Sequence, residues 1–100
     1  MMVKNGMRPI HPGEILREDY LEPLGLSVNA LSKALKVPTT RMNEIVREHR
    51  GISADTALRL ARYFQTTERF WLNLQTEYDL RKVQIRSAER VASEVSPYAA

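Results

Sequence analysis

Two short segments that are joined by only three residues constrain the fold of this chain more than any other feature of its sequence. Residues 28–35 and residues 39–48 both show the spacing of apolar positions that a helix with one buried side requires. The apolar positions are Val28, Leu31 and Leu35 in the first segment and Met42, Ile45 and Val46 in the second. The connection, Lys36-Val37-Pro38, places a proline at a helix start, where its missing N–H is not needed. We therefore predict two short helices that are joined by a tight turn.

Three further helices are predicted around this pair. The first covers residues 13–22 and is ended by Pro23 and Gly25. The fourth begins after Ser53, and the fifth, covering residues 68–87, is the longest. A serine or threonine stands before three of the five helices, where its hydroxyl can accept a hydrogen bond from a free amide of the first turn: Ser27, Ser53 and Thr67. The sequence shows no strand pattern, so it predicts an all-α fold with five helices.

The chain is expected to form one domain. Its 100 residues are 43% hydrophobic, which is enough for one small core. We expect a flexible arm in residues 1–12, the helical domain in residues 13–87 and a tail in residues 88–100. The chain has no cysteine, and His11 and His49 lie far apart in the sequence, where each is expected to cap a helix or lie at the surface. We therefore expect no disulfide, no metal site and no cofactor.

The predicted last helix is apolar on two sides, which usually means that it has two packing partners. One side carries Phe70, Trp71, Leu74, Tyr78 and Ile85, and the other carries Leu72, Leu80 and Val83. One partner is the core of the domain, and the other can be a second copy of the chain. We therefore expect a homodimer that forms through the first of these sides, although Trp71 fits the core of a single chain equally well.

Two helices that are joined by a tight turn form a helix-turn-helix unit, in which the second helix enters the major groove of DNA. Residues 39–48 fit this role because their helix is polar on the side away from the core. Thr39 and Thr40 stand at its N-terminal end, where each can contact a base or a phosphate. Asn43 can bond bidentately to adenine, and Arg47 can pair with guanine or with a phosphate. The alternative is a polar helix side that contacts only solvent.

Other residues can hold this helix against the DNA backbone. Those that we expect near phosphates are the side chains of Arg41 and Lys36, and the amides around Ser27 and Asn29 at a helix N-terminus. The acidic Glu44 is unusual on a helix that faces a polyanion. It either accepts a hydrogen bond from a cytosine amine or orients Arg41 or Arg47.

Composition restricts the class of function. The net charge of +3 and the pI of about 9.5 fit a nucleic-acid partner, although they are weak evidence alone. No apolar run is long enough to cross a membrane, and the opening MMVKNGMRPIHPG lacks the apolar centre of a signal peptide, so we expect a cytoplasmic protein. No catalytic triad or phosphate-binding loop is found, so we expect no enzyme. The outer side of residues 39–47 has no aromatic residue, which favours duplex DNA over RNA.

Four stretches of the chain are RPIHPGEILREDYLEPLGLS, LSKALKVPTTRMNEIVREHRGIS, DTALRLARYF and FWLNLQTEYDL. They resemble the HigA-type antitoxins, within the phage-repressor-like helix-turn-helix proteins, and HPGEIL and FWLNLQ are the most specific parts. The resemblance runs from about Arg8 to Leu80. It implies an antitoxin that neutralises a HigB-type toxin, a ribosome-dependent mRNA endonuclease of the RelE class. It also implies a homodimer, joined through residues 70–85, that binds palindromic operator DNA through residues 39–47 and represses its own operon.

The surface that contacts the toxin is left open by the sequence. The first helix carries an acidic group consisting of Glu14, Glu18, Asp19 and Glu22. A toxin that binds RNA should be basic, so this group is a plausible electrostatic match, and an ordinary solvated helix side is the alternative. A second alternative concerns the function as a whole: a stand-alone helix-turn-helix regulator that has no toxin partner.

Overall fold

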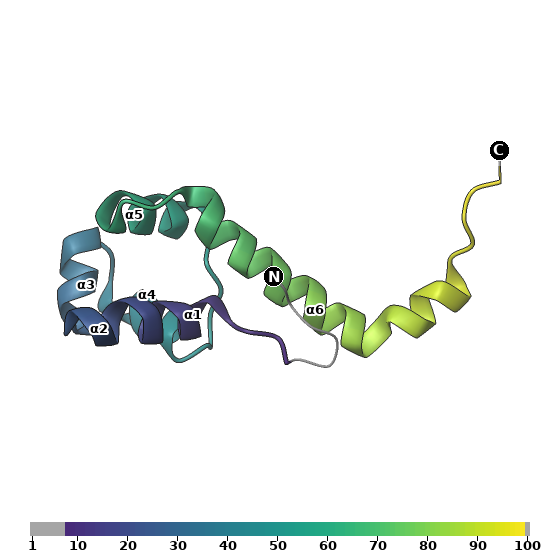
Figure 1. Ribbon diagram of the computed structural model, residues 1–100, viewed down its shortest axis with the longest axis horizontal. Helices are drawn as coiled ribbons and strands as arrows, with labels where there is room; N and C mark the ends of the chain where they lie inside the picture. Colours follow the sequence, from purple (N-terminus) through teal and green to yellow (C-terminus); the bar gives the residue numbers. More distant parts are fainter. Residues whose placement is uncertain (1–7, 100) are drawn as a thin grey trace.

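The computed structural model describes residues 8–99, and these form helices that are joined by short turns (Figure 1). The elements are α1 (Pro12–Ile15), η1 (Leu16–Leu21), α2 (Glu22–Leu24), α3 (Val28–Leu35), α4 (Thr39–Val46), α5 (Ala54–Phe64) and α6 (Glu68–Glu94). The first three follow one another without a gap and make one helix, so the all-α fold with five helices is confirmed. No strand occurs within residues 8–99.

The first helix is longer than predicted. It runs from Pro12 to Leu24, and Pro23 lies inside it rather than ending it. In a regular α-helix the proline ring would collide with the carbonyl four residues earlier. Here the preceding η1 turn is wider, with the amide of Glu22 bonding to the carbonyl of Arg17, which relieves that collision. Gly25 then ends the helix in the left-handed conformation, at a φ of 62°.

One hydrophobic core joins all five helices. Its buried members are Leu16, Leu21, Leu31, Leu35, Met42, Ile45, Val46, Ile52, Ala57, Leu60, Ala61 and Trp71. Trp71 is fully buried within a single chain, and its indole N–H donates to Thr66 Oγ1 over 2.8 Å. Trp71 therefore belongs to the core, which is one of the two alternatives that the sequence left open, and it is not part of a dimer surface.

The helix starts follow the predicted capping pattern. Ser27, Ser53 and Thr67 each accept a hydrogen bond from an amide in the first turn, over 3.0, 3.2 and 3.1 Å. His11 caps the first helix through Nδ1, which accepts from the amide of Gly13 over 2.8 Å. Its predicted capping role is confirmed, but the ring is buried rather than at the surface.

The last helix, α6, continues to Glu94 instead of ending at residue 87, so residues 88–94, which were expected to be tail, are helical. Its first half packs on α5 and α1, whereas its second half projects away from the other helices (Figure 1). The projecting half leaves several apolar side chains exposed: Leu80, Val83, Ile85 and Val91. In the part of the chain that the structure describes, no helix is long and apolar enough to cross a membrane.

Candidate nucleic-acid interface

The turn between α3 and α4 fixes the angle between the two helices. Lys36 adopts the left-handed conformation at a φ of 61°, and the amide of Val37 returns to the carbonyl of Ser32 over 3.1 Å. This pattern closes α3 at its C-terminal end. Pro38, in extended conformation, then starts α4 directly. The helix-turn-helix unit predicted from the sequence is therefore present.

Helix α4 has two chemically different sides. Met42 and Ile45 are fully buried and anchor the helix to the core, as predicted. Thr40, Asn43 and Arg47 are exposed on the other side. Among residues 8–99, no ion pair holds the guanidinium of Arg47. These amide, hydroxyl and guanidinium groups are the kinds that distinguish base edges in a major groove.

The N-terminal ends of α3 and α4 meet. The hydroxyl of Thr39 donates a hydrogen bond to Asn29 Oδ1 over 3.3 Å. The Ser27 hydroxyl is occupied by its own cap, so it is the backbone there, rather than the side chain, that is suited to a phosphate. Lys36 is exposed at the turn nearby. The predicted phosphate-contacting residues thus lie beside the residues predicted to contact bases.

Two charged residues of α4 are engaged within the protein. Arg41 Nη1 lies 2.8 Å from Asp55 Oδ2 at the start of α5. Hydrogen bonds from Arg41 and Arg59 hold the pKa of Asp55 below its ordinary value. Glu44 pairs with Arg50 at 2.7 Å, so the expectation that Glu44 orients Arg41 or Arg47 was wrong. This pairing explains how a carboxylate is accommodated on α4, because Arg50 neutralises it.

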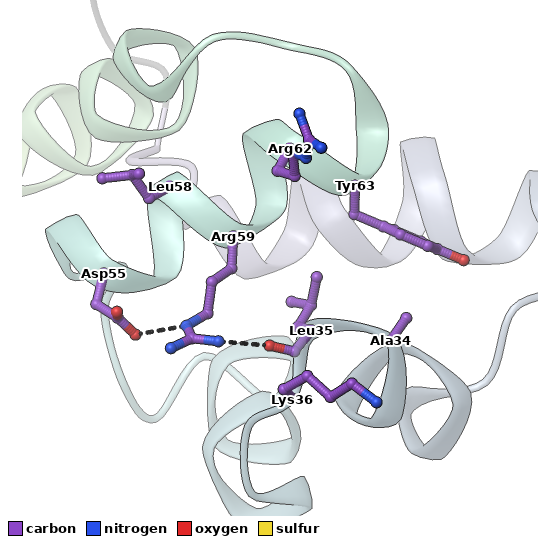
Figure 2. A pocket seen from close by; sticks show the side chains of 8 residues that line it. All are labelled: Ala34, Leu35, Lys36, Asp55, Leu58, Arg59, Arg62 and Tyr63. Carbon is purple, nitrogen blue, oxygen red and sulfur yellow. Dashed lines mark hydrogen bonds and ion pairs between the residues drawn. The ribbon is translucent and has the colours of Figure 1, made fainter.

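A hollow of about 670 Å³ lies between the C-terminal end of α3 and the outer side of α5, and the sequence analysis did not identify it (Figure 2). Its lining mixes cationic and apolar side chains: Lys36, Arg59, Arg62, Leu58 and Tyr63. Arg59 bridges the two helices, because it donates to the carbonyl of Leu35 over 2.8 Å and to Asp55 over 3.0 Å. The feature of the sequence that could have indicated this hollow is the mixture of cationic and apolar residues along the outer side of α5.

The predicted dimer residues are not all on the surface. Tyr78 packs edge-on against the His11 ring at a centroid distance of 4.8 Å, and Phe70 packs against Trp71 at 4.9 Å. Leu74 is half-buried against the core. Of the predicted set, only Ile85 is mostly exposed, at 60%. Phe70 is also partly exposed, at 36%, so part of the predicted range of residues 70–85 is left uncovered.

Comparison with known proteins agrees with this geometry. A family model described as helix-turn-helix matches residues 18–71. The chain is 64% identical to the virulence-associated protein I of Dichelobacter nodosus, over 81% of this chain and 75% of that protein. It is 34% identical to the antitoxin HigA-1 of Vibrio cholerae, over 88% of this chain and 83% of that protein. The chain belongs to the HigA family of helix-turn-helix antitoxins.

A solved structure of a HigA protein matches nearly the whole fold. The Pseudomonas aeruginosa antitoxin HigA, solved with the higBA promoter, superposes with a TM-score of 0.88 at 50% identity. The match covers 92% of this chain and 100% of the HigA chain. The resemblance to HigA-type antitoxins that the sequence suggested is confirmed.

Proposed function

We propose that this HigA-family chain binds operator DNA by inserting α4 into the major groove. The observation that carries the proposal is the division of α4 into a side buried through Met42 and Ile45 and an exposed side with Thr40, Asn43 and Arg47. The solved HigA protein with promoter DNA supports the same use of the fold. Because the proposed partner is DNA, the chain would act in the cytoplasm.

We further propose that the chain acts as a homodimer. A single small module buries too little DNA surface for tight and selective binding. Two modules related by a two-fold axis contact half-sites that are roughly 34 Å apart, which suits a palindromic operator. On the projecting half of α6, the exposed Ile85 continues the apolar side that the sequence assigned to the dimer, and a second copy could cover it.

The third part of the proposal is neutralisation of a HigB-type toxin. Antitoxin HigA-1 is among the relatives, and the first helix presents acidic residues to solvent. Glu14 is not one of them, because its side chain is only 17% exposed and lies 2.9 Å from Arg8. The acidic surface therefore consists of Glu18, Asp19 and Glu22, and it would meet a basic toxin. The chain itself would have no catalytic role.

Two experiments test these proposals separately. The first measures binding of the purified chain to the DNA upstream of its own gene, with an unrelated duplex of equal length as the control. Equal affinity for both duplexes would exclude operator recognition. The second expresses the chain together with its neighbouring genes and identifies any copurified partner by mass. If a toxin gene is absent and expression gives no protection from a HigB-type toxin, the alternative of a stand-alone regulator holds.

A further inference from the structure

The first helix contacts the C-terminal end of α4 on the side that faces away from the exposed polar residues. The closest approach is at Gly13. A Cβ atom built on Gly13 would lie 1.8 Å from the carbonyl oxygen of Ile45, far inside van der Waals contact. Only glycine lets the two backbones come this close. The first helix therefore acts as a rigid support for the last turn of α4.

Arg17 adds a polar contact to this support. Its Nη1 donates a hydrogen bond to the carbonyl of Val46, and its Nη2 lies 3.2 Å from Glu48 Oε2. The carbonyls in the last turn of a helix have no partner within the helix, so Arg17 supplies one from outside. Arg47, which is proposed to contact DNA, follows Val46 directly and carries the cap of α4. One guanidinium thus contacts the backbone before Arg47, at Val46, and the side chain after it, at Glu48.

The segment after α4 is fixed in the same way. The amide of Ile52 donates to Gln75 Oε1 of α6 over 2.6 Å. The ring of His11, which caps the first helix, packs on Tyr78 of α6. The end of α4 is therefore held by the first helix, and the segment that follows it is held by α6.

We propose that Arg17, supported by Gly13, is a positioning residue for sequence recognition. It sets the height and rotation of the last turn of α4, so that Asn43 and Arg47 meet base edges in hydrogen-bonding geometry. A recognition site must be held within about 0.5 Å and 10–20° to work well, which makes a rigid support behind α4 effective. The inference rests on the proposed binding of DNA through α4. It concerns a residue that does not itself contact DNA.

A purely structural role for Arg17 makes a different prediction. In that case its loss would lower the melting temperature but, well below that temperature, would leave the preference for operator over unrelated DNA unchanged. A positioning role predicts a lower preference in chains that remain fully folded. A direct phosphate contact predicts a third result, because each lost contact reduces the dependence of affinity on salt by about one unit of logarithmic slope.

The experiment compares Arg17→Met, Arg17→Lys and the control Arg69→Met, which removes the same charge from an exposed position on α6. Affinity for the upstream duplex and for an unrelated duplex is measured over a range of salt concentrations, and the folded state is verified by circular dichroism. We expect Arg17→Met to reduce the ratio of the two affinities about tenfold, as a lost base contact would, with an unchanged salt slope. Arg17→Lys should recover part of the ratio, and Arg69→Met should keep it.

An unchanged ratio in folded Arg17→Met, or a salt slope reduced by about one, would overturn the inference. If Arg17→Met does not fold, Arg17→Lys takes its place, because a single ammonium cannot bond to Val46 and Glu48 in the way that the guanidinium does. A folded Arg17→Lys chain with an unchanged ratio would also overturn it. Asn43→Ala tests the proposed function separately. If Asn43→Ala lowers the ratio and Arg17→Met does not, only the positioning role fails.

Discussion

Arg41 of α4 and Asp55 of α5 form an ion pair at 2.8 Å that ties the first turn of α4 to the next helix. Asp55 also binds Arg59, and Arg59 donates to the carbonyl at the end of α3. The three helices α3, α4 and α5 are therefore linked through one carboxylate. This carboxylate also occupies a guanidinium that the sequence placed near a DNA phosphate.

Asp55→Asn should strengthen binding to DNA at low salt. The substitution removes a negative charge and frees Arg41, which can then reach a phosphate. One added phosphate contact should steepen the dependence of log K on log salt by about 0.9. Fluorescence anisotropy over a salt series measures this slope. A slope equal to that of the unmodified chain would mean that Arg41 does not reach DNA even when it is released.

Asn43→Ala and Arg47→Ala should each weaken operator binding by about 1–3 kcal/mol, because each removes a group suited to bidentate contact with a base. Both side chains are exposed, so folding should be little affected. Gel-shift titration measures the change, and Arg69→Ala is the control. Normal affinity in both variants would show that the wrong side of α4 has been assigned to DNA.

Gly13→Ala should destabilise the fold by about 1–3 kcal/mol or more, since the added methyl group overlaps the backbone of α4. Gly25→Ala is a matched control. It lies in the left-handed region with open space around it, so it should lose only about 1 kcal/mol of conformational energy. Urea unfolding compares the two. Equal losses would show that the contact between Gly13 and Ile45 is not tight.

Stability should fall as pH is lowered through the range in which histidine titrates. Burial lowers the pKa of His11, and its Nδ1 must be unprotonated to accept from Gly13. Between the ordinary pKa of about 6.5 and the lower folded value, the unfolded chain binds more protons, so acid favours unfolding. The stability that neutral His11 contributes is fully present above its pKa in the unfolded chain. It is lost as pH falls through its pKa in the folded chain.

The prediction for His11 is tested by measuring the urea midpoint of unfolding as a function of pH. The charges of Glu48, Asp79 and Lys82 also act on the ring. His11→Asn keeps a capping side chain and should remove most of the pH dependence. A variant with the same pH profile as the unmodified chain would contradict the assignment to His11.

Ile85→Glu should give a folded monomer if the projecting half of α6 forms the dimer. The side chain is 60% exposed, so a charge there should not disturb the core of one chain. Leu74→Glu is a less specific test, because Leu74 packs against the core and its substitution should unfold the chain as well. Light scattering distinguishes a mass of 11.5 kDa from twice that value. A folded Ile85→Glu dimer would place the interface elsewhere.

Local features of the sequence predicted much of this structure. The caps at Ser27, Ser53 and Thr67 and the buried side of α4 follow from spacing within a few residues, and all are confirmed. The end of α6 was misjudged because apolar residues become sparse after residue 87. Ala88, Glu89 and Arg90 are nevertheless strong helix formers, and the helix continues through them.

Contacts between distant segments could not be predicted in the same way. The partner of Glu44 is Arg50 rather than a neighbour on its own helix, and the contact of Gly13 with Ile45 joins residues far apart in the chain. Nothing in the local pattern of HPGEIL distinguishes a glycine needed for close packing from one that merely starts a helix. Pro23 was likewise predicted to end the first helix, as a proline usually does. The wide η1 turn before it removes the steric collision that would cause this.

The continuity of α6 has a consequence for the spacing of DNA sequences. Its 27 residues form a helical rod, about 40 Å long along its axis and bent in its outer part, that starts in the core at Trp71 and ends outside the domain (Figure 1). If two chains join through the outer part of this rod, no flexible linker separates the two copies of α4. Inserting one residue midway would lengthen the rod by about 1.5 Å and rotate its far end by about 100°. The interval between the two halves of a palindrome would then be specified by the length of a protein helix.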